Sequence, residues 1–221
     1  MTKTILYLNK NGTEEIQTVE MFSQNEKGLL YSAIAMGAIF GSALIVTFVQ
    51  KFGARFTFTC YGLISAFCTL LSPLTANQGF LSFFVIRIIQ GFGTSVTFAS
   101  IGYVSSAWFP LESSGLFLSL LTTYVQLAPL FTMPTSGEFC ISKSGWPGVY
   151  YLHGILTIIC FALFYLVYRD SPRDHCYVSD IELAQIEKSK STASFNSENL
   201  KIPYFQMISD QVIIGILFAC F

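Results

Sequence analysis

Long apolar runs constrain this chain more than any other feature of its sequence. Between positions 28 and 111 the only Lys, Arg, Asp or Glu residues are Lys51, Arg55 and Arg87. Such runs exceed the roughly 20 residues that a helix needs to cross a bilayer. Charged residues make up 11% of the chain and hydrophobic residues 52%, which leaves too few charges to cover a water-soluble domain. The sequence therefore predicts an all-α, polytopic transmembrane helical bundle.

Turn-forming and polar residues divide the apolar sequence into separate spans. The basic turn from Lys51 to Arg55 ends the first span, and Asn77-Gln78-Gly79 ends the second. The predicted complete spans are 29–49, 56–74, 80–107, 115–134 and 149–168, and a shorter apolar run covers 212–221. Because about ten residues cannot cross a bilayer, this last run is interpreted as the start of a sixth span.

These boundaries suggest four regions with a defined orientation. Seven Lys and Arg residues fall in the turn 51–55 and the polar stretch 169–201, whereas four fall on the opposite side. This bias places residues 169–210 in the cytoplasm, as a linker with a short surface helix from Ser179, and residues 1–28 outside, as an extracellular or lumenal tail. Residues 29–168 form the five-helix bundle, and 211–221 begin a further helix. The tail contains a glycosylation sequon at Asn11.

Small residues recur along two of the spans. Ala33, Gly37 and Gly41 repeat every fourth position in the first span, and Gly91 and Ser95 do so in the third. Helices in lipid pack through such stripes because small side chains let backbones approach. The stripes predict helix contacts, either static or moving.

Arg87 is the most informative single residue. A guanidinium inside a span is costly unless it faces a polar cavity or a partner, so such residues usually line a pathway or bind a ligand. Gln90 and Thr94 follow at helical spacing and extend a polar face without an acid, which suggests an anionic ligand. The alternative is that Arg87 lies near the end of its span and reaches lipid headgroups.

Several short stretches together resemble the major facilitator superfamily, in particular its anion:cation symporter branch, solute carrier family 17. That branch includes vesicular glutamate transporters, sialin and sodium/phosphate cotransporter relatives. The matching stretches, in chain order, are Gln50-Lys51-Phe52-Gly53-Ala54-Arg55, Arg87-Ile88-Ile89-Gln90-Gly91, Trp108-Phe109-Pro110-Leu111-Glu112, Met133-Pro134, Ser144-Gly145-Trp146-Pro147-Gly148-Val149-Tyr150-Tyr151 and Asp170-Ser171-Pro172 with His175.

The resemblance implies a function and a set of partners. The five spans would correspond to family helices two to six, so the chain would form one wall of a cavity completed by a missing transporter half. It implies symport of organic anions or inorganic phosphate, with H⁺ or Na⁺ as the coupling cation. The protein would be an integral multi-pass protein of the plasma membrane or of a vesicular or lysosomal membrane, embedded in the lipid bilayer.

The resemblance also assigns roles to individual residues. Arg87 would recognise the substrate anion, with Gln90, Thr94 and Tyr31 beside it in the substrate site. Lys51, Gly53 and Arg55 would form the cytoplasmic gating motif. Two of these positions depart from the family pattern: Thr94 replaces an acid that couples protons in many members, and Tyr31 replaces a histidine of the vesicular glutamate branch.

These departures leave a second reading open. The chain could be a non-transporting truncated or degenerate paralogue that acts as a membrane assembly partner. An enzyme is not expected, because His153 and His175 have no companion nucleophile or acid cluster. The six cysteines lack metal-ligand spacing, so no cofactor or metal site is predicted, and a net charge of −1 indicates no nucleic-acid partner.

Overall fold

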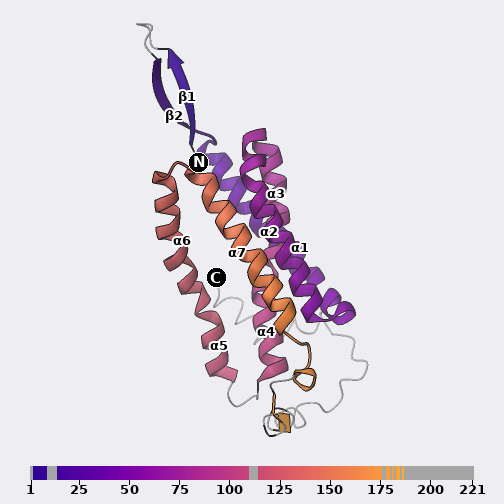
Figure 1. Ribbon diagram of the computed structural model, residues 1–221. Helices are drawn as coiled ribbons and strands as arrows, with labels where there is room; N and C mark the ends of the chain where they lie inside the picture. The colour runs from indigo at the N-terminus through magenta and orange to yellow at the C-terminus, as the bar shows by residue number, and fades with distance from the viewer. Residues whose placement is uncertain are drawn as a thin grey trace.

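The computed structural model describes residues 2–8, 14–109 and 114–175, together with 178, 179, 181, 183, 184 and 186. Within this part of the chain, seven α-helices form a bundle of long rods (Figure 1). Four helical stretches are long and apolar enough to cross a membrane: Gln24–Phe52, Ala54–Gln78, Phe80–Trp108 and Gly145–Val167. The predicted all-α membrane bundle is therefore confirmed.

The first two helices are separated by a single glycine. Helix α1 spans Gln24–Phe52 and begins with a capping box in which the Ser23 and Glu26 side chains each bond the other's backbone N–H. Helix α2 spans Ala54–Gln78 and contains Pro73. Gly53 between them has a φ of 81°, a conformation that other residues rarely adopt. This glycine lets the chain reverse direction within one residue.

The third predicted span is divided at Ser95. Helix α3 covers Phe80–Thr94 and helix α4 covers Val96–Trp108. At the junction the Ser95 hydroxyl donates to the Phe92 carbonyl oxygen at 2.8 Å, and its backbone N–H also points to that oxygen at 3.4 Å. Side-chain bonds of this kind compete with the regular helical ladder and interrupt it locally.

The fourth predicted span, 115–134, is also divided. Helix α5 covers Ser114–Thr122 and α6 covers Tyr124–Ile141, with the Thr123 hydroxyl donating to the Ser119 carbonyl oxygen at 2.9 Å between them. The helix continues past Pro134, because a proline inside a membrane helix can be accommodated by its neighbours. Helix α7 follows over Gly145–Val167, and a 3₁₀ turn covers Pro172–Asp174.

The N-terminal region holds a hairpin that the sequence pattern did not predict. Strands β1 (Thr2–Leu8) and β2 (Glu14–Glu20) pair antiparallel, with Thr2 opposite Glu20 and Leu8 opposite Glu14. The hairpin extends from the end of the bundle at which α1 begins (Figure 1). The sequon at Asn11 and the apolar run 212–221 lie outside the described residues.

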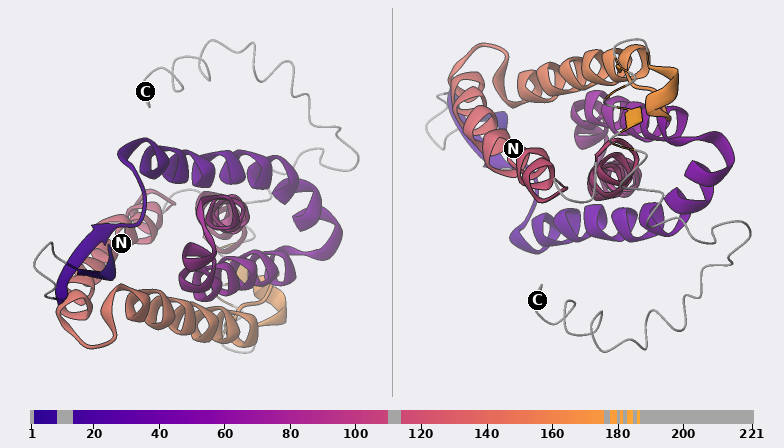
Figure 2. Two further views of the ribbon diagram at one scale, coloured as in Figure 1. Left: turned by 90° about the horizontal axis from the view of Figure 1, so that it is seen from above. Right: turned by 90° about the horizontal axis from the view of Figure 1, so that it is seen from below.

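Helix α3 lies between α1 and α2, while α7 runs along α2 and α6 contacts α7 (Figure 2). The α1–α3 contact is very close: a Cβ atom at Gly37 would collide with the Ile88 carbonyl oxygen, and one at Gly91 with the Ile34 carbonyl oxygen. Ala33, Gly37 and Gly41 are all buried. The predicted small-residue stripe of the first span therefore lies in a helix contact.

Many large apolar side chains point outward. Phe98 is 78% exposed, Met133 74% and Leu130 71%. In water so much exposed apolar surface would drive association, but in a bilayer it faces lipid. The outward surface of the bundle therefore fits a membrane.

Candidate functional site

Arg87 lies half-buried on α3 and points toward α7. Its Nη2 atom donates to the Tyr150 hydroxyl oxygen at 2.7 Å, and its Nη1 atom donates to Gln90 Oε1 at 3.0 Å. The guanidinium carbon also lies 4.7 Å from the centroid of the Phe83 ring. All three partners are neutral, so they orient the guanidinium without cancelling its charge.

Gln90 is itself held by a further chain of hydrogen bonds. Its Nε2 atom donates to the Thr69 hydroxyl oxygen at 2.8 Å, and that hydroxyl donates to the Ser65 carbonyl oxygen at 2.8 Å. The amide oxygen of Gln90 is thereby turned toward Arg87. Residues of α2, α3 and α7 together fix the position of one positive charge.

Arg87 borders a cavity of about 290 Å³. The cavity is close to the lower size limit of small-molecule sites, which bury a ligand among apolar walls with a few polar groups. Two cationic side chains, two tyrosines and four apolar residues line it: Lys27, Arg87, Tyr31, Tyr150, Phe22, Leu30, Ile34 and Phe83. Its chemistry suits a small anion with an apolar part.

The charge balance of this cavity is positive. Within the described ranges, the single ion pair closer than 4 Å joins Lys27 Nζ and Glu20 Oε2 at 2.7 Å, so Arg87 has no carboxylate at that distance. Glu20 is exposed, and the hydrogen bond and charge of Lys27 lower the pKa of its carboxyl group. Glu20 is therefore ionised at neutral pH and balances Lys27, while the charge of Arg87 stays unbalanced.

The structure brings together only some of the predicted substrate-site residues. Arg87 and Tyr31 both line the cavity, and Gln90 supports Arg87 from behind. Thr94 is exposed and its hydroxyl donates to the Gln90 carbonyl oxygen at 2.9 Å, away from the residues that line the cavity.

Two polar residues of the cavity wall, Lys27 and Tyr150, were not predicted. Tyr150 belongs to a recognised stretch, but its contact with Arg87 spans 63 positions and depends on how α3 and α7 pack. Lys27 lies one helical turn before Tyr31, and that i, i+4 spacing is the signal that could have indicated it.

The predicted gating residues lie at the opposite end of α1. The Arg55 backbone N–H donates to Asp170 Oδ1 at 2.7 Å, and Arg55 Nε donates to the Tyr165 carbonyl oxygen at 2.6 Å. A Cβ atom at Gly53 would lie 2.5 Å from Asp170 Oδ2, and the φ of 81° also disfavours other residues at this position. Lys51 Nζ lies 5.4 Å from the centroid of the adjacent Phe52 ring. The turn between α1 and α2 is thus tied to the end of α7.

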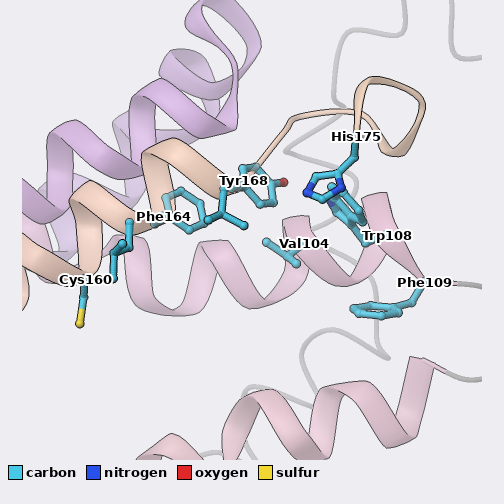
Figure 3. Close-up of a pocket in the computed structure, with 9 residues that line it drawn as sticks. Val104, Trp108, Phe109, Cys160, Phe164, Tyr168 and His175 are labelled. Atoms are coloured by element: carbon cyan, nitrogen blue, oxygen red, sulfur yellow. The ribbon is translucent and has the colours of Figure 1, made fainter. Parts of the chain in front are cut away.

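A second, larger cavity of about 480 Å³ lies between α4 and α7 near the same end (Figure 3). Figure 3 shows Trp108, Tyr168 and His175 grouped there, with the Trp108 and His175 rings nearly perpendicular and 5.3 Å apart. The residues that line it are almost all apolar. Its ionisable side chains are those of His175, Tyr168 and Cys160. This cavity therefore has no feature that would select an anion.

The four helices of membrane-spanning length and composition define a multi-pass membrane protein. A sequence profile of the Major Facilitator Superfamily matches residues 7–221, so the chain belongs to that superfamily. The superfamily match and the helices of membrane-spanning length agree in describing a membrane protein.

Two curated relatives illustrate the similarity. The chain is 26% identical over 191 residues to sodium-dependent phosphate transport protein 3 of Mus musculus, covering 86% of this chain and 39% of that protein. It is 23% identical over 204 residues to the uncharacterized transporter slc-17.3 of Caenorhabditis elegans, covering 88% of this chain and 37% of that protein. The chain thus spans about two fifths of these relatives, and the predicted resemblance to solute carrier family 17 is confirmed.

A solved structure shares the fold. The xylose transporter XylE from E. coli, in an inward open conformation, matches with a TM-score of 0.62 and 16% sequence identity. The match covers 82% of this chain and 48% of XylE. At this identity the likeness describes the arrangement of helices alone.

Proposed function

We propose that this chain takes part in secondary transport of small anions, either organic anions or inorganic phosphate, across a membrane. The observation that carries the proposal is Arg87, a half-buried guanidinium held by Tyr150 and Gln90 at the wall of a cavity and lacking a carboxylate partner there. A positive charge away from bulk water is stabilised by a negative ligand. A bound anion supplies the charge that the surrounding neutral groups do not.

The proposed pathway needs a second wall. The chain spans about two fifths of its curated relatives, so we propose that a further helical bundle closes the cavity and alternates with this one. In this scheme the turn containing Lys51, Gly53 and Arg55 is the cytoplasmic gate, and its bonds to Tyr165 and Asp170 brace the turn against the end of α7 while the two bundles alternate.

The coupling cation is proposed to be Na⁺ in preference to H⁺. Thr94 cannot titrate, and it occupies the position at which many members of the family carry an acid. Sodium dependence is named for the mouse relative, which supports the same choice.

The experiment that tests the anion site compares Arg87→Ala with the unaltered chain in lipid nanodiscs. Binding of labelled phosphate should weaken tenfold or more, because each hydrogen bond to a charged group contributes roughly 1.5–3 kcal/mol. Lys143→Ala is the matched control, since Lys143 is an exposed cation in the turn between α6 and α7 and does not line the cavity. Equal phosphate binding by Arg87→Ala and the unaltered chain would contradict the proposal.

Uptake into liposomes then separates transport from binding. Uptake of labelled phosphate that depends on Arg87 supports transport. Arg87-dependent binding without any uptake, even when the proposed further bundle is supplied from a relative, supports the alternative of a non-transporting assembly partner.

A further inference from the structure

Lys27 is the second positive charge on the wall of the Arg87 cavity. It lies on the first turns of α1, four residues before Tyr31, which lines the same cavity. The capping box of Ser23 and Glu26 fixes the beginning of this helix, with Ser23 N–H donating to Glu26 Oε2 at 2.7 Å. Lys27 is therefore carried on an anchored helical turn and not on a loose terminus.

The segment before α1 closes one end of the cavity. The Phe22 ring stacks on the Phe83 ring, with centroids 5.6 Å apart and an interplanar angle of 10°. Phe22 is 6% exposed and belongs to a buried cluster with Leu30 and Phe83. Because Phe22 is fixed in this way, Glu20 is held two residues away, where it pairs with Lys27 of the cavity wall.

Lys27 and Arg87 differ in what balances their charge. Glu20 Oε2 lies 2.7 Å from Lys27 Nζ, whereas the hydrogen-bond partners of Arg87 are neutral. The Glu20 side chain is 60% exposed and that of Lys27 is 30% exposed, so the carboxylate lies on the water side of the pair. An exposed ion pair contributes little stability, and Glu20 can return to water at small cost.

Building on the proposed function, we propose that the Lys27–Glu20 pair makes the cavity selective for small anions with two negative charges. The first charge of such a ligand binds Arg87. The second charge replaces Glu20 at Lys27. A ligand with one charge binds Arg87 and leaves the ion pair unchanged, so it gains nothing from Lys27.

Because the ligand competes with Glu20 for Lys27, substitutions of Lys27 and of Glu20 should change the affinity for a dianion in opposite directions. Removing the charge of Lys27 removes the second contact of a dianion, whereas removing the charge of Glu20 removes its competitor. If the pair served only to hold the hairpin against α1, both substitutions would break the same bond and would change anion binding in the same direction. The sign of the two effects therefore distinguishes selectivity from a purely structural role.

The test measures binding of succinate and butyrate, which have the same number of carbons and two or one carboxylates, by calorimetry in nanodiscs. For Lys27→Gln we expect succinate affinity to fall about tenfold, the effect of losing one charge-assisted contact, while butyrate affinity changes less than about twofold. For Glu20→Gln we expect succinate affinity to rise about threefold, again with butyrate unchanged. Lys143→Gln and Glu138→Gln, both exposed and away from the cavity, are the matched controls.

Three outcomes overturn the inference. The inference is contradicted if Lys27→Gln leaves the ratio of succinate affinity to butyrate affinity unchanged. The anion site itself still stands in that case, provided that Arg87→Ala abolishes binding of both ligands. Loss of succinate affinity in both Lys27→Gln and Glu20→Gln assigns the pair a structural role instead. Failure of the unaltered chain to bind either anion in an Arg87-dependent way contradicts the proposed function and this inference together.

Discussion

At the scale of single residues, Arg87 illustrates how a cation is kept in a largely apolar bundle. Its two hydrogen bonds, to Tyr150 and Gln90, satisfy donors without supplying negative charge. Desolvation of an unbalanced charge costs free energy. The fold nevertheless keeps the charge of Arg87 beside a cavity, where an anionic ligand can balance it. The same site would be inactive if the protein provided its own carboxylate.

This reasoning leads to a prediction about Gln90. Replacing Gln90 with Glu changes one atom of the side chain and places a carboxylate beside Arg87 Nη1. An internal ion pair should then form and compete with any anionic ligand, so phosphate binding should weaken at least tenfold, as for Arg87→Ala. Binding of labelled phosphate in nanodiscs measures the effect.

Gln90→Leu is the matched control for this prediction. It removes the same amide but adds no charge, and Tyr150 continues to hold the guanidinium. We expect Gln90→Leu to retain most of the phosphate affinity. A larger loss in Gln90→Leu than in Gln90→Glu would mean that Gln90 orients Arg87 and that charge balance is secondary.

At the scale of helices, the contact between α1 and α3 positions the cavity. Gly37 and Gly91 bring the two backbones so close that each faces a carbonyl oxygen of the other helix. Tyr31 and Lys27 of α1 and Arg87 of α3 line one cavity as a result. Small residues thus set the separation of the two helices that carry its charges.

Gly37→Ala tests this dependence. The added methyl group would meet the Ile88 carbonyl oxygen, and such overpacking costs typically 1–3 kcal/mol. We expect a lower unfolding temperature in detergent and weaker phosphate binding. Gly28→Ala on the same helix is the matched control, because nothing lies within 4 Å of a Cβ atom there, and it should leave both measurements unchanged or slightly raise stability. Equal behaviour of the two variants would contradict the close α1–α3 contact.

Sequence patterns predicted the helices better than they predicted the cavity. The length and hydropathy of apolar runs indicated the membrane helices, and the isolated charge of Arg87 indicated the site, because both are local properties of the chain. The breaks at Ser95 and Thr123 fall within otherwise continuous apolar runs, so hydropathy does not reveal them. Tyr150 reaches the cavity only through the packing of α7, which spacing along the chain does not specify, whereas the spacing of Lys27 from Tyr31 is a local signal.

At the scale of the whole molecule, the two ends of the bundle differ in composition. The hairpin, the beginning of α1 and the turn between α6 and α7 lie at one end, while the turn of Arg55 and the end of α7 lie at the other (Figure 1). The bias of Lys and Arg along the sequence predicts that the second end faces the cytoplasm. In that orientation the cavity lined by Lys27, at the beginning of α1, lies toward the outer or lumenal side.

Single cysteines introduced into a chain whose six native cysteines are replaced by serine test this orientation. Ser142, between α6 and α7, and Arg173, beyond α7, are exposed at opposite ends of the bundle. In cells whose plasma membrane is opened with digitonin, Arg173→Cys should react with an impermeant maleimide before internal membranes are dissolved, because it faces the cytoplasm. Ser142→Cys should react either in intact cells, if the protein lies in the plasma membrane, or only after full detergent treatment, if it lies in an internal one.

The cysteine-free parent is the control for background labelling. Reaction of Arg173→Cys in intact cells would reverse the orientation, and with it the side from which Lys27 and Arg87 receive an anion.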